Sequence, residues 1–113
     1  MTPSPIDPAT FAELQDTAGA DFVVELVETF LEEAPGLLGE LEAARAAGDA
    51  VAFQRAAHSL KSNAVIFGAF AFGEMARDFE RGGLALAPDA AALRGLHRAY
   101  AEVATALKRL QHG

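Results

Sequence analysis

The chain has 113 residues, which suits one compact domain, and 51% of them are hydrophobic, so it can form a core. Its formal net charge of −7 disfavours nucleic acid and anionic membrane surfaces as partners, and the lack of cysteine excludes disulfides and thiolate metal sites. Strong helix formers, alanine above all, outnumber β-branched residues, and this predicts an all-α protein.

The sequence carries no sign of a membrane span or a secretion signal. No apolar run approaches the roughly 20 residues that a spanning helix needs. The first residues also lack the basic stretch, followed by an apolar one, that marks a signal peptide. By elimination, we expect a cytoplasmic protein.

The N-terminal segment divides into a tail and a helix start. Prolines predict that residues 1–6 form a flexible tail, and we expect residues 7–113 to form a single domain. Asp7 can cap a helix whose first position is Pro8, and proline is well suited to that position. The spacing predicts a short helix that ends near residue 17.

A long second helix is predicted from about Asp21 to Gly48. Its apolar residues recur at steps of four and three and form one stripe: Val23, Val27, Phe30, Ala34, Leu37, Leu41 and Ala44. Pro35 lies inside this stripe, so the helix either kinks there or splits into two. We favour one long kinked helix, because the stripe keeps its phase across the proline.

Three further helices are predicted, over residues 50–67, over residues 69–81, and from about residue 88 to the C-terminal end. Each carries apolar residues at helical spacing, and glycines lie at the expected breaks. Long amphipathic helices with short connections pack well in antiparallel order. We therefore expect an antiparallel up-and-down four-helix bundle, with the short N-terminal helix covering one end.

His58 is the residue that core packing does not explain. The apolar stripe of its helix centres about 150° away from it, so its side chain should face solvent. Its helical face also carries Gln54, Lys61, Ser62 and Val65. No acidic residue and no second histidine is on that face, so neither a metal site nor a serine–histidine–aspartate arrangement is predicted. We assign no role to the other two histidines, His97 and His112.

Residues 57–69, with the sequence AHSLKSNAVIFGA, resemble the signature of histidine-containing phosphotransfer (HPt) domains. That signature reads Ala-His-x-Leu-Lys-Gly, then mostly small residues, then a hydrophobic residue, Gly and Ala. Residues 25–35 resemble the family's long second helix, and residues 47–49 its link into the histidine helix. The resemblance covers about residues 7–111. The chain departs from the signature at Ser62, where the family usually has glycine.

The resemblance implies that His58 carries a phosphoryl group in a multistep phosphorelay of two-component signalling. Lys61 would offer a cation to the phosphoryl oxygens, one turn from the ring. Ser62 would leave clearance around the imidazole, and Gln54 would border the same face. The chain has no Gly-rich phosphate loop and no acidic Mg²⁺ cluster, so we expect a carrier and not an autonomous kinase.

The same resemblance suggests partners and a docking surface. A response-regulator receiver domain would supply the acceptor aspartate and the Mg²⁺, a histidine or hybrid sensor kinase would act upstream, and the chain would be a monomer without a cofactor of its own. Val65 and Ile66 add apolar surface beside His58 and are expected to contact the receiver. By family analogy, Phe11 and Leu14 of the short first helix would join that surface.

Three other hypotheses fit parts of the sequence. The chain could be a helical adaptor that docks on receiver domains without carrying phosphate, although the pairing of His58 with Lys61 argues against it. It could be a purely structural bundle. A dimerising histidine helix of a sensor kinase is disfavoured, because an acidic residue would follow the histidine there, and Ser59 follows it here.

Overall fold

The computed structural model describes residues 4–112, which fold into α-helices and two short 3₁₀ turns and contain no β-strand. The predicted all-α class is thus confirmed. The elements follow in the order α1 (Pro8–Ala18), α2 (Ala20–Ala47), α3 (Ala50–Val65), α4 (Phe70–Gly82), the 3₁₀ turns Gly83–Leu86 and Ala90–Leu93, and α5 (Arg94–His112).

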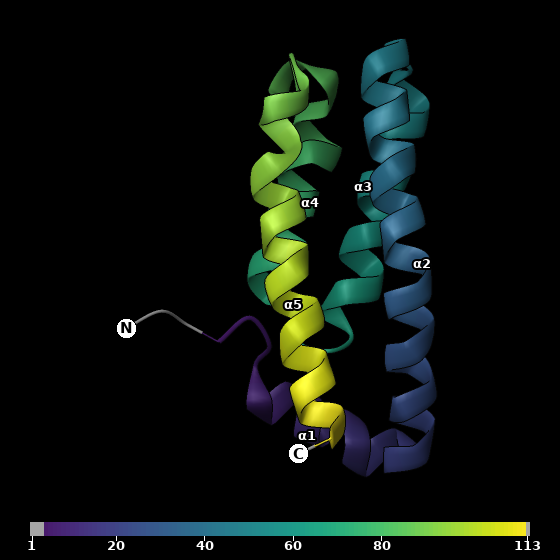
Figure 1. Ribbon diagram of the computed structural model, residues 1–113, viewed down its shortest axis with the longest axis vertical. Coiled ribbons are helices and arrows are strands. Elements are labelled where there is room, and N and C mark those ends of the chain that lie inside the picture. The colour runs from purple at the N-terminus through teal and green to yellow at the C-terminus, as the bar shows by residue number, and fades with distance from the viewer. Residues whose placement is uncertain (1–3, 113) are drawn as a thin grey trace.

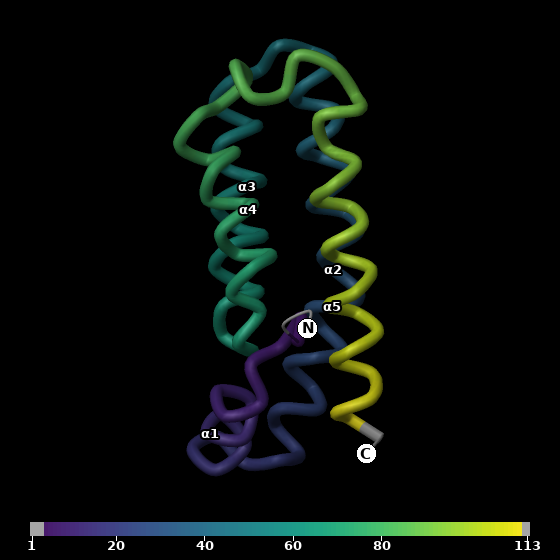
Figure 2. Tube along the Cα trace, turned by 90° about the vertical axis from the view of Figure 1, so that its left-hand side faces the viewer, coloured from purple at the N-terminus to yellow at the C-terminus, as the bar shows by residue number. Residues whose placement is uncertain are grey.

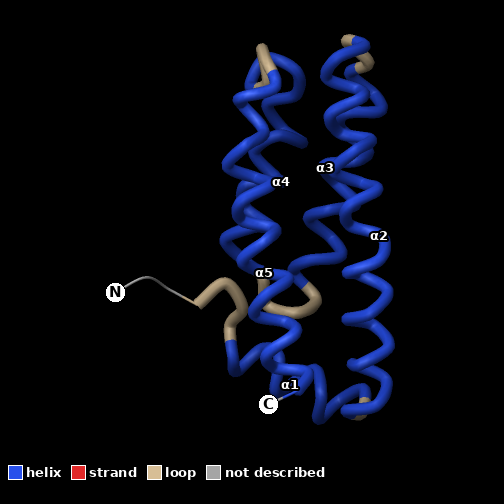
Figure 3. The backbone as a smooth tube through the Cα atoms, viewed as in Figure 1, coloured by secondary structure: helices blue, strands red, loops and turns tan. Residues whose placement is uncertain are grey.

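Helices α2, α3, α4 and α5 run up and down as an antiparallel four-helix bundle (Figure 1). The view turned by 90° shows α3 and α4 paired on one side, α2 and α5 on the other, and α1 below the bundle (Figure 2). The connections from α1 to α2, from α2 to α3 and from α3 to α4 are short, whereas α4 and α5 are joined through the two 3₁₀ turns (Figure 3). The expected bundle with its extra N-terminal helix is therefore confirmed, and α5 ends on the same side of the bundle as α1 (Figure 1).

The predicted apolar stripes form the core. Among the fully buried large side chains are residues from every long helix: Val23, Val27, Leu41, Phe53, Leu60, Phe72, Leu96, Val103 and Leu107. On α2 the stripe continues through Leu38, whereas Leu37 is only partly buried. The helix is continuous across Pro35, so it does not split into two there. The exposed position of Pro35 lets the interior face of α2 pass through unbroken.

The start of the domain is fixed more firmly than the sequence suggested. Ile6 was predicted to belong to a flexible tail over residues 1–6, and this is wrong, because its side chain is 1% exposed and lies in the core. Next to it, the Asp7 N–H donates to the Gly68 carbonyl at 2.9 Å, which ties the entry of α1 to the α3–α4 turn. The prediction of a flexible tail also covers residues 1–3, which lie outside the described residues.

Candidate functional site

His58 lies in the second half of α3, on the side of the helix that faces away from the core. The helix begins at an Asp49 cap whose carboxylate accepts from the Ala52 N–H at 3.1 Å. Ala57 and Leu60, on either side of His58 in sequence, are fully buried and anchor the helix. The His58 side chain itself is 57% exposed, as its phase on the helix predicts. The imidazole is therefore held on a fixed backbone and is open to another molecule.

Glu80 of α4 reaches across to this imidazole. One carboxylate oxygen, Oε2, lies 2.7 Å from Nδ1 of His58, and the other, Oε1, lies 3.0 Å from Nζ of Lys61. The expectation that no acid borders His58 is therefore wrong. That expectation considered only the face of one helix, and Glu80 follows His58 by 22 residues and approaches from the neighbouring helix.

The carboxylate decides which ring nitrogen is free. An ionised carboxylate only accepts hydrogen bonds, so Nδ1 of His58 must donate, and a neutral imidazole then has its lone pair on Nε2. The ammonium group of Lys61 holds the pKa of the Glu80 carboxyl below its usual range against the effect of burial, and the hydrogen bond from His58 adds to that lowering. Glu80 is therefore ionised near neutral pH, and the free lone pair of a neutral His58 ring lies on Nε2.

The two other predicted polar neighbours take different places. Ser62 Oγ lies 3.4 Å from Nε2 of His58, within hydrogen-bond reach of the free nitrogen. Gln54 does not touch the ring, because its Nε2 donates to the backbone carbonyl of Glu80 at 3.3 Å. Gln54 thus links α3 to α4 beside His58, while Ser62 borders the free ring nitrogen.

Exposed apolar side chains lie at the end of α3 beyond His58. Val65 is 36% exposed and Ile66 is 48% exposed, so neither belongs to the core. Phe70, at the start of α4, is 49% exposed and was not singled out from the sequence. Val65 and Phe70 line one shallow groove between α3 and α4, so the apolar surface extends from one helix to the other.

The predicted contribution of α1 to this surface is wrong for Phe11. Its side chain is 3% exposed and belongs to the core cluster, and Leu14 is partly buried against that cluster. The helix has only two large apolar residues of its own, and both are used to close the end of the bundle. Phe11 is therefore unavailable to a docking partner.

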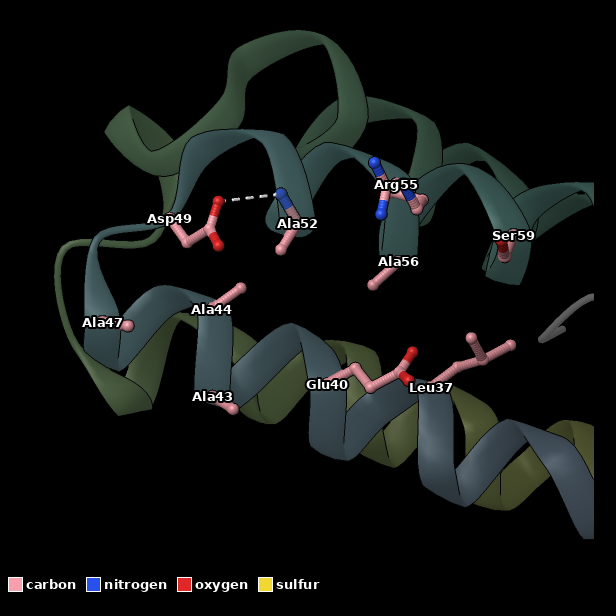
Figure 4. A pocket seen from close by; sticks show the side chains of 10 residues that line it. All are labelled: Leu37, Glu40, Ala43, Ala44, Ala47, Asp49, Ala52, Arg55, Ala56 and Ser59. Atoms are coloured by element: carbon pink, nitrogen blue, oxygen red, sulfur yellow. Dashed lines mark hydrogen bonds between the residues drawn. The ribbon is translucent and has the colours of Figure 1, made fainter.

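A separate groove of about 450 Å³ runs along the other flank of α3, toward α2 (Figure 4). Arg55 and Ser59 line it from α3, and Leu37 and Glu40 line it from α2. His58 does not line this groove. The two flanks of α3 thus carry separate grooves. The groove on the flank toward α4 is lined by Lys61 and Ser62, and the groove toward α2 is not.

Three other kinds of feature would matter in the rest of the described chain: a metal site, a membrane-spanning helix and a further histidine site. Among the described residues, no group of three or more His, Cys, Asp or Glu side chains could hold a metal ion. None of the described helices is long and apolar enough to cross a membrane. His97 is exposed on α5 and has no hydrogen bond to a described side chain, and the His112 side chain lies outside the described part.

An antiparallel four-helix bundle with one exposed and oriented imidazole has the architecture of a histidine phosphotransfer domain. The sequence model of the Hpt domain matches residues 25–113, so the chain belongs to the Hpt domain family. Its structure is similar to that of histidine-containing phosphotransfer protein B (HptB) from Pseudomonas aeruginosa PAO1, with a TM-score of 0.86 and 26% identity over 98% of this chain and 97% of that one. No curated protein sequence matches the chain.

Proposed function

We propose that His58 carries the phosphoryl group and exchanges it, through Nε2, with the aspartate of a receiver domain. One observation carries this assignment. The 2.7 Å contact between Nδ1 and Glu80 fixes the ring on an exposed face and leaves its other nitrogen free. A nucleophile needs an accessible lone pair in a set orientation, and the orienting group here is the carboxylate.

The transfer step follows from that orientation. The lone pair on Nε2 attacks the phosphorus of the aspartyl phosphate in line, and the bond from phosphorus to the aspartyl oxygen breaks. Its electron pair leaves on the aspartate carboxylate. The ring, which keeps its proton on Nδ1, becomes a phosphorylated imidazolium, and the carboxylate of Glu80 balances the new positive charge. In the reverse step the aspartate attacks phosphorus, and the imidazole leaves as a neutral group.

Lys61 supports the site through Glu80. Its ammonium group is 3.0 Å from Oε1, so it holds the carboxylate in place and keeps it ionised. The side chain is 28% exposed, and a rotation toward the ring would bring its charge to the phosphoryl oxygens during transfer. Lys61 is thus proposed to serve both the orientation of His58 and the charge of the transition state.

The partners in this proposal supply what the chain does not. The receiver brings the acidic pocket, the Mg²⁺ and the acceptor aspartate, and a histidine or hybrid sensor kinase stands upstream in the relay. We propose that the chain acts as a monomer, and the contacts among His58, Glu80 and Lys61 within one chain require no second copy. It acts as a carrier that gains and returns the group, and not as a kinase.

Two-way transfer tests this function. The chain is incubated with a receiver that carries a labelled aspartyl phosphate, and is then separated and offered to an unlabelled receiver. We expect label that is stable in base and labile in acid, as a phosphohistidine is, and its return to the second receiver. Binding to the receiver without any transfer of label would instead make the chain a non-phosphorylated adaptor.

Val65→Glu tests the proposed docking surface. A charge on this apolar patch should weaken binding to the receiver about tenfold. The melting temperature should change little, because the side chain is already 36% exposed. Binding and melting are measured by calorimetry. Val51→Glu is the matched control, since Val51 is 65% exposed at the far end of the same helix. Equal affinities of both variants and the unmodified chain would show that the receiver docks elsewhere.

A further inference from the structure

The free nitrogen of His58 has a definite direction. Nδ1 is held by Glu80 at 2.7 Å, and Nε2 lies 3.4 Å from Ser62 Oγ, one helical turn further along α3. A phosphoryl group bonded to Nε2 therefore extends along α3 toward Ser62, and away from the Glu80 carboxylate. This places the phosphoryl oxygens at the end of the α3–α4 groove that begins with Lys61 and Ser62.

That groove has a volume of about 660 Å³ and is open to solvent. Its α3 wall consists of Lys61, Ser62 and Val65. Its α4 wall begins with an apolar residue and ends with two arginines. In chain order the residues of this wall are Phe70, Gly73, Glu74, Arg77 and Arg81. The groove is thus apolar at the Val65 end and cationic at the end near His58.

The antiparallel register of α3 and α4 singles out Arg77. His58 contacts Glu80, and a Cβ atom on Gly73 would come within 2.7 Å of Val65 Cγ1, so these pairs lie at the same levels. Between these two levels, Arg77 is the α4 residue that faces Lys61 and Ser62. Arg81 lies one turn further along α4, on the Nδ1 side of the ring. Arg77 is therefore the arginine on the side of the free nitrogen.

Arg77 also has its charge available. Within residues 4–111, the described ion pairs involve Arg45, His58 and Lys61, and none involves Arg77, although Glu74 lies on the same helix one turn away. Lys61, by contrast, is already bonded to Glu80. The exposed guanidinium of Arg77 can donate two parallel hydrogen bonds to two oxygens of one phosphoryl group, because its donors form a planar fork that an ammonium group lacks.

We propose that the α3–α4 groove binds the phosphoryl group of phosphorylated His58, with Arg77 donating to its oxygens and the Ser62 hydroxyl donating beside it. Lys61 remains on Glu80 in this state. The inference rests on the proposed function, because it concerns the phosphorylated form of His58. In this proposal the negative charge of the phosphoryl group is neutralised by Arg77, a residue of α4 that lies outside the sequence motif around His58.

The test uses a chain phosphorylated without any receiver, by reaction with phosphoramidate. The titration of the phosphoryl group is followed by ³¹P NMR, and the signal is assigned to His58 by its absence from His58→Gln. A nearby guanidinium favours the dianion, so Arg77→Ala should raise the second pKa of the phosphoryl group by about one unit. Arg77→Lys should recover part of that shift, because it restores the charge without the paired donors.

Arg55→Ala is the matched control, because Arg55 is one turn from His58 on the same helix but lines the groove toward α2 (Figure 4). It should leave the titration nearly unchanged. A titration indifferent to Arg77, or equally sensitive to both arginines, would overturn the inference and leave the relay proposal intact. Failure of a receiver to transfer label would overturn the relay proposal alone. Absence of any signal that depends on His58 would overturn both.

Discussion

Replacing Glu80 with alanine is expected to slow phosphoryl transfer from a receiver about 10- to 100-fold. The carboxylate is the sole described side chain that contacts Nδ1 of His58, at 2.7 Å. Without it, the ring is free to rotate and to place its proton on Nε2, and that tautomer has no lone pair where the phosphorus must arrive. The positive charge of the phosphorylated ring also loses its counter-charge. The same change releases Lys61, whose charge then offsets part of the loss.

Rapid-quench transfer rates measure this effect, and ¹⁵N NMR of the ring reports the tautomer directly. The transfer rate of Glu80→Gln should fall between the rates of Glu80→Ala and the unmodified chain. Its amide oxygen still accepts from Nδ1 but carries no charge. Glu102→Ala is the control for loss of one exposed glutamate, since Glu102 lies on α5 and makes no described ion pair. A rate for Glu80→Ala within about twofold of the unmodified chain would show that the receiver alone orients the imidazole.

Much of the fold could be predicted from local sequence. Helical spacing of apolar residues predicted the buried faces of α2 and α3. The residues that define these faces are all in the core: Val23, Val27 and Phe30 on α2, and Phe53, Ala57 and Leu60 on α3. The exposure of His58 followed from the same phase. These inferences succeed because one helical face depends only on spacing along the chain.

Other features depend on which helices meet. Glu80 could not be placed beside His58 from the sequence, because the contact joins two helices and the register between them is a tertiary property. A signal was nevertheless present, since a glutamate beside the apolar stripe of α4 is positioned to face a neighbouring helix. Phe11 was misassigned because a short helix with two large apolar residues does not reveal whether they face its own bundle or a partner.

Ile6 illustrates a further limit. Prolines earlier in the chain suggested a loose tail, but a single large apolar residue can be buried when the backbone next to it is fixed. The hydrogen bond from the Asp7 N–H to Gly68 provides that fixed point, and its partner is distant in sequence. Composition predicts flexibility over a window of residues, whereas burial is decided residue by residue.

His58→Gln should abolish labelling by a phosphorylated receiver while leaving the helical circular dichroism and the affinity for the receiver nearly unchanged. Glutamine has a similar reach but no nucleophilic nitrogen. The replaced side chain is 57% exposed, so its loss leaves no cavity in the core. His97→Gln is the matched control, because His97 is also an exposed histidine on a long helix. Its labelling should equal that of the unmodified chain.

The most direct measurement is the NMR assignment of the phosphorylated atom in the unmodified chain. Coupling between ³¹P and the ring nuclei distinguishes a phosphoryl group on Nε2 from one on Nδ1. The contact of Glu80 with Nδ1 predicts a single phosphohistidine, at Nε2 of His58. A phosphoryl group on Nδ1 of His58, or on His97, would contradict the proposed orientation of the ring and, in the second case, the site itself.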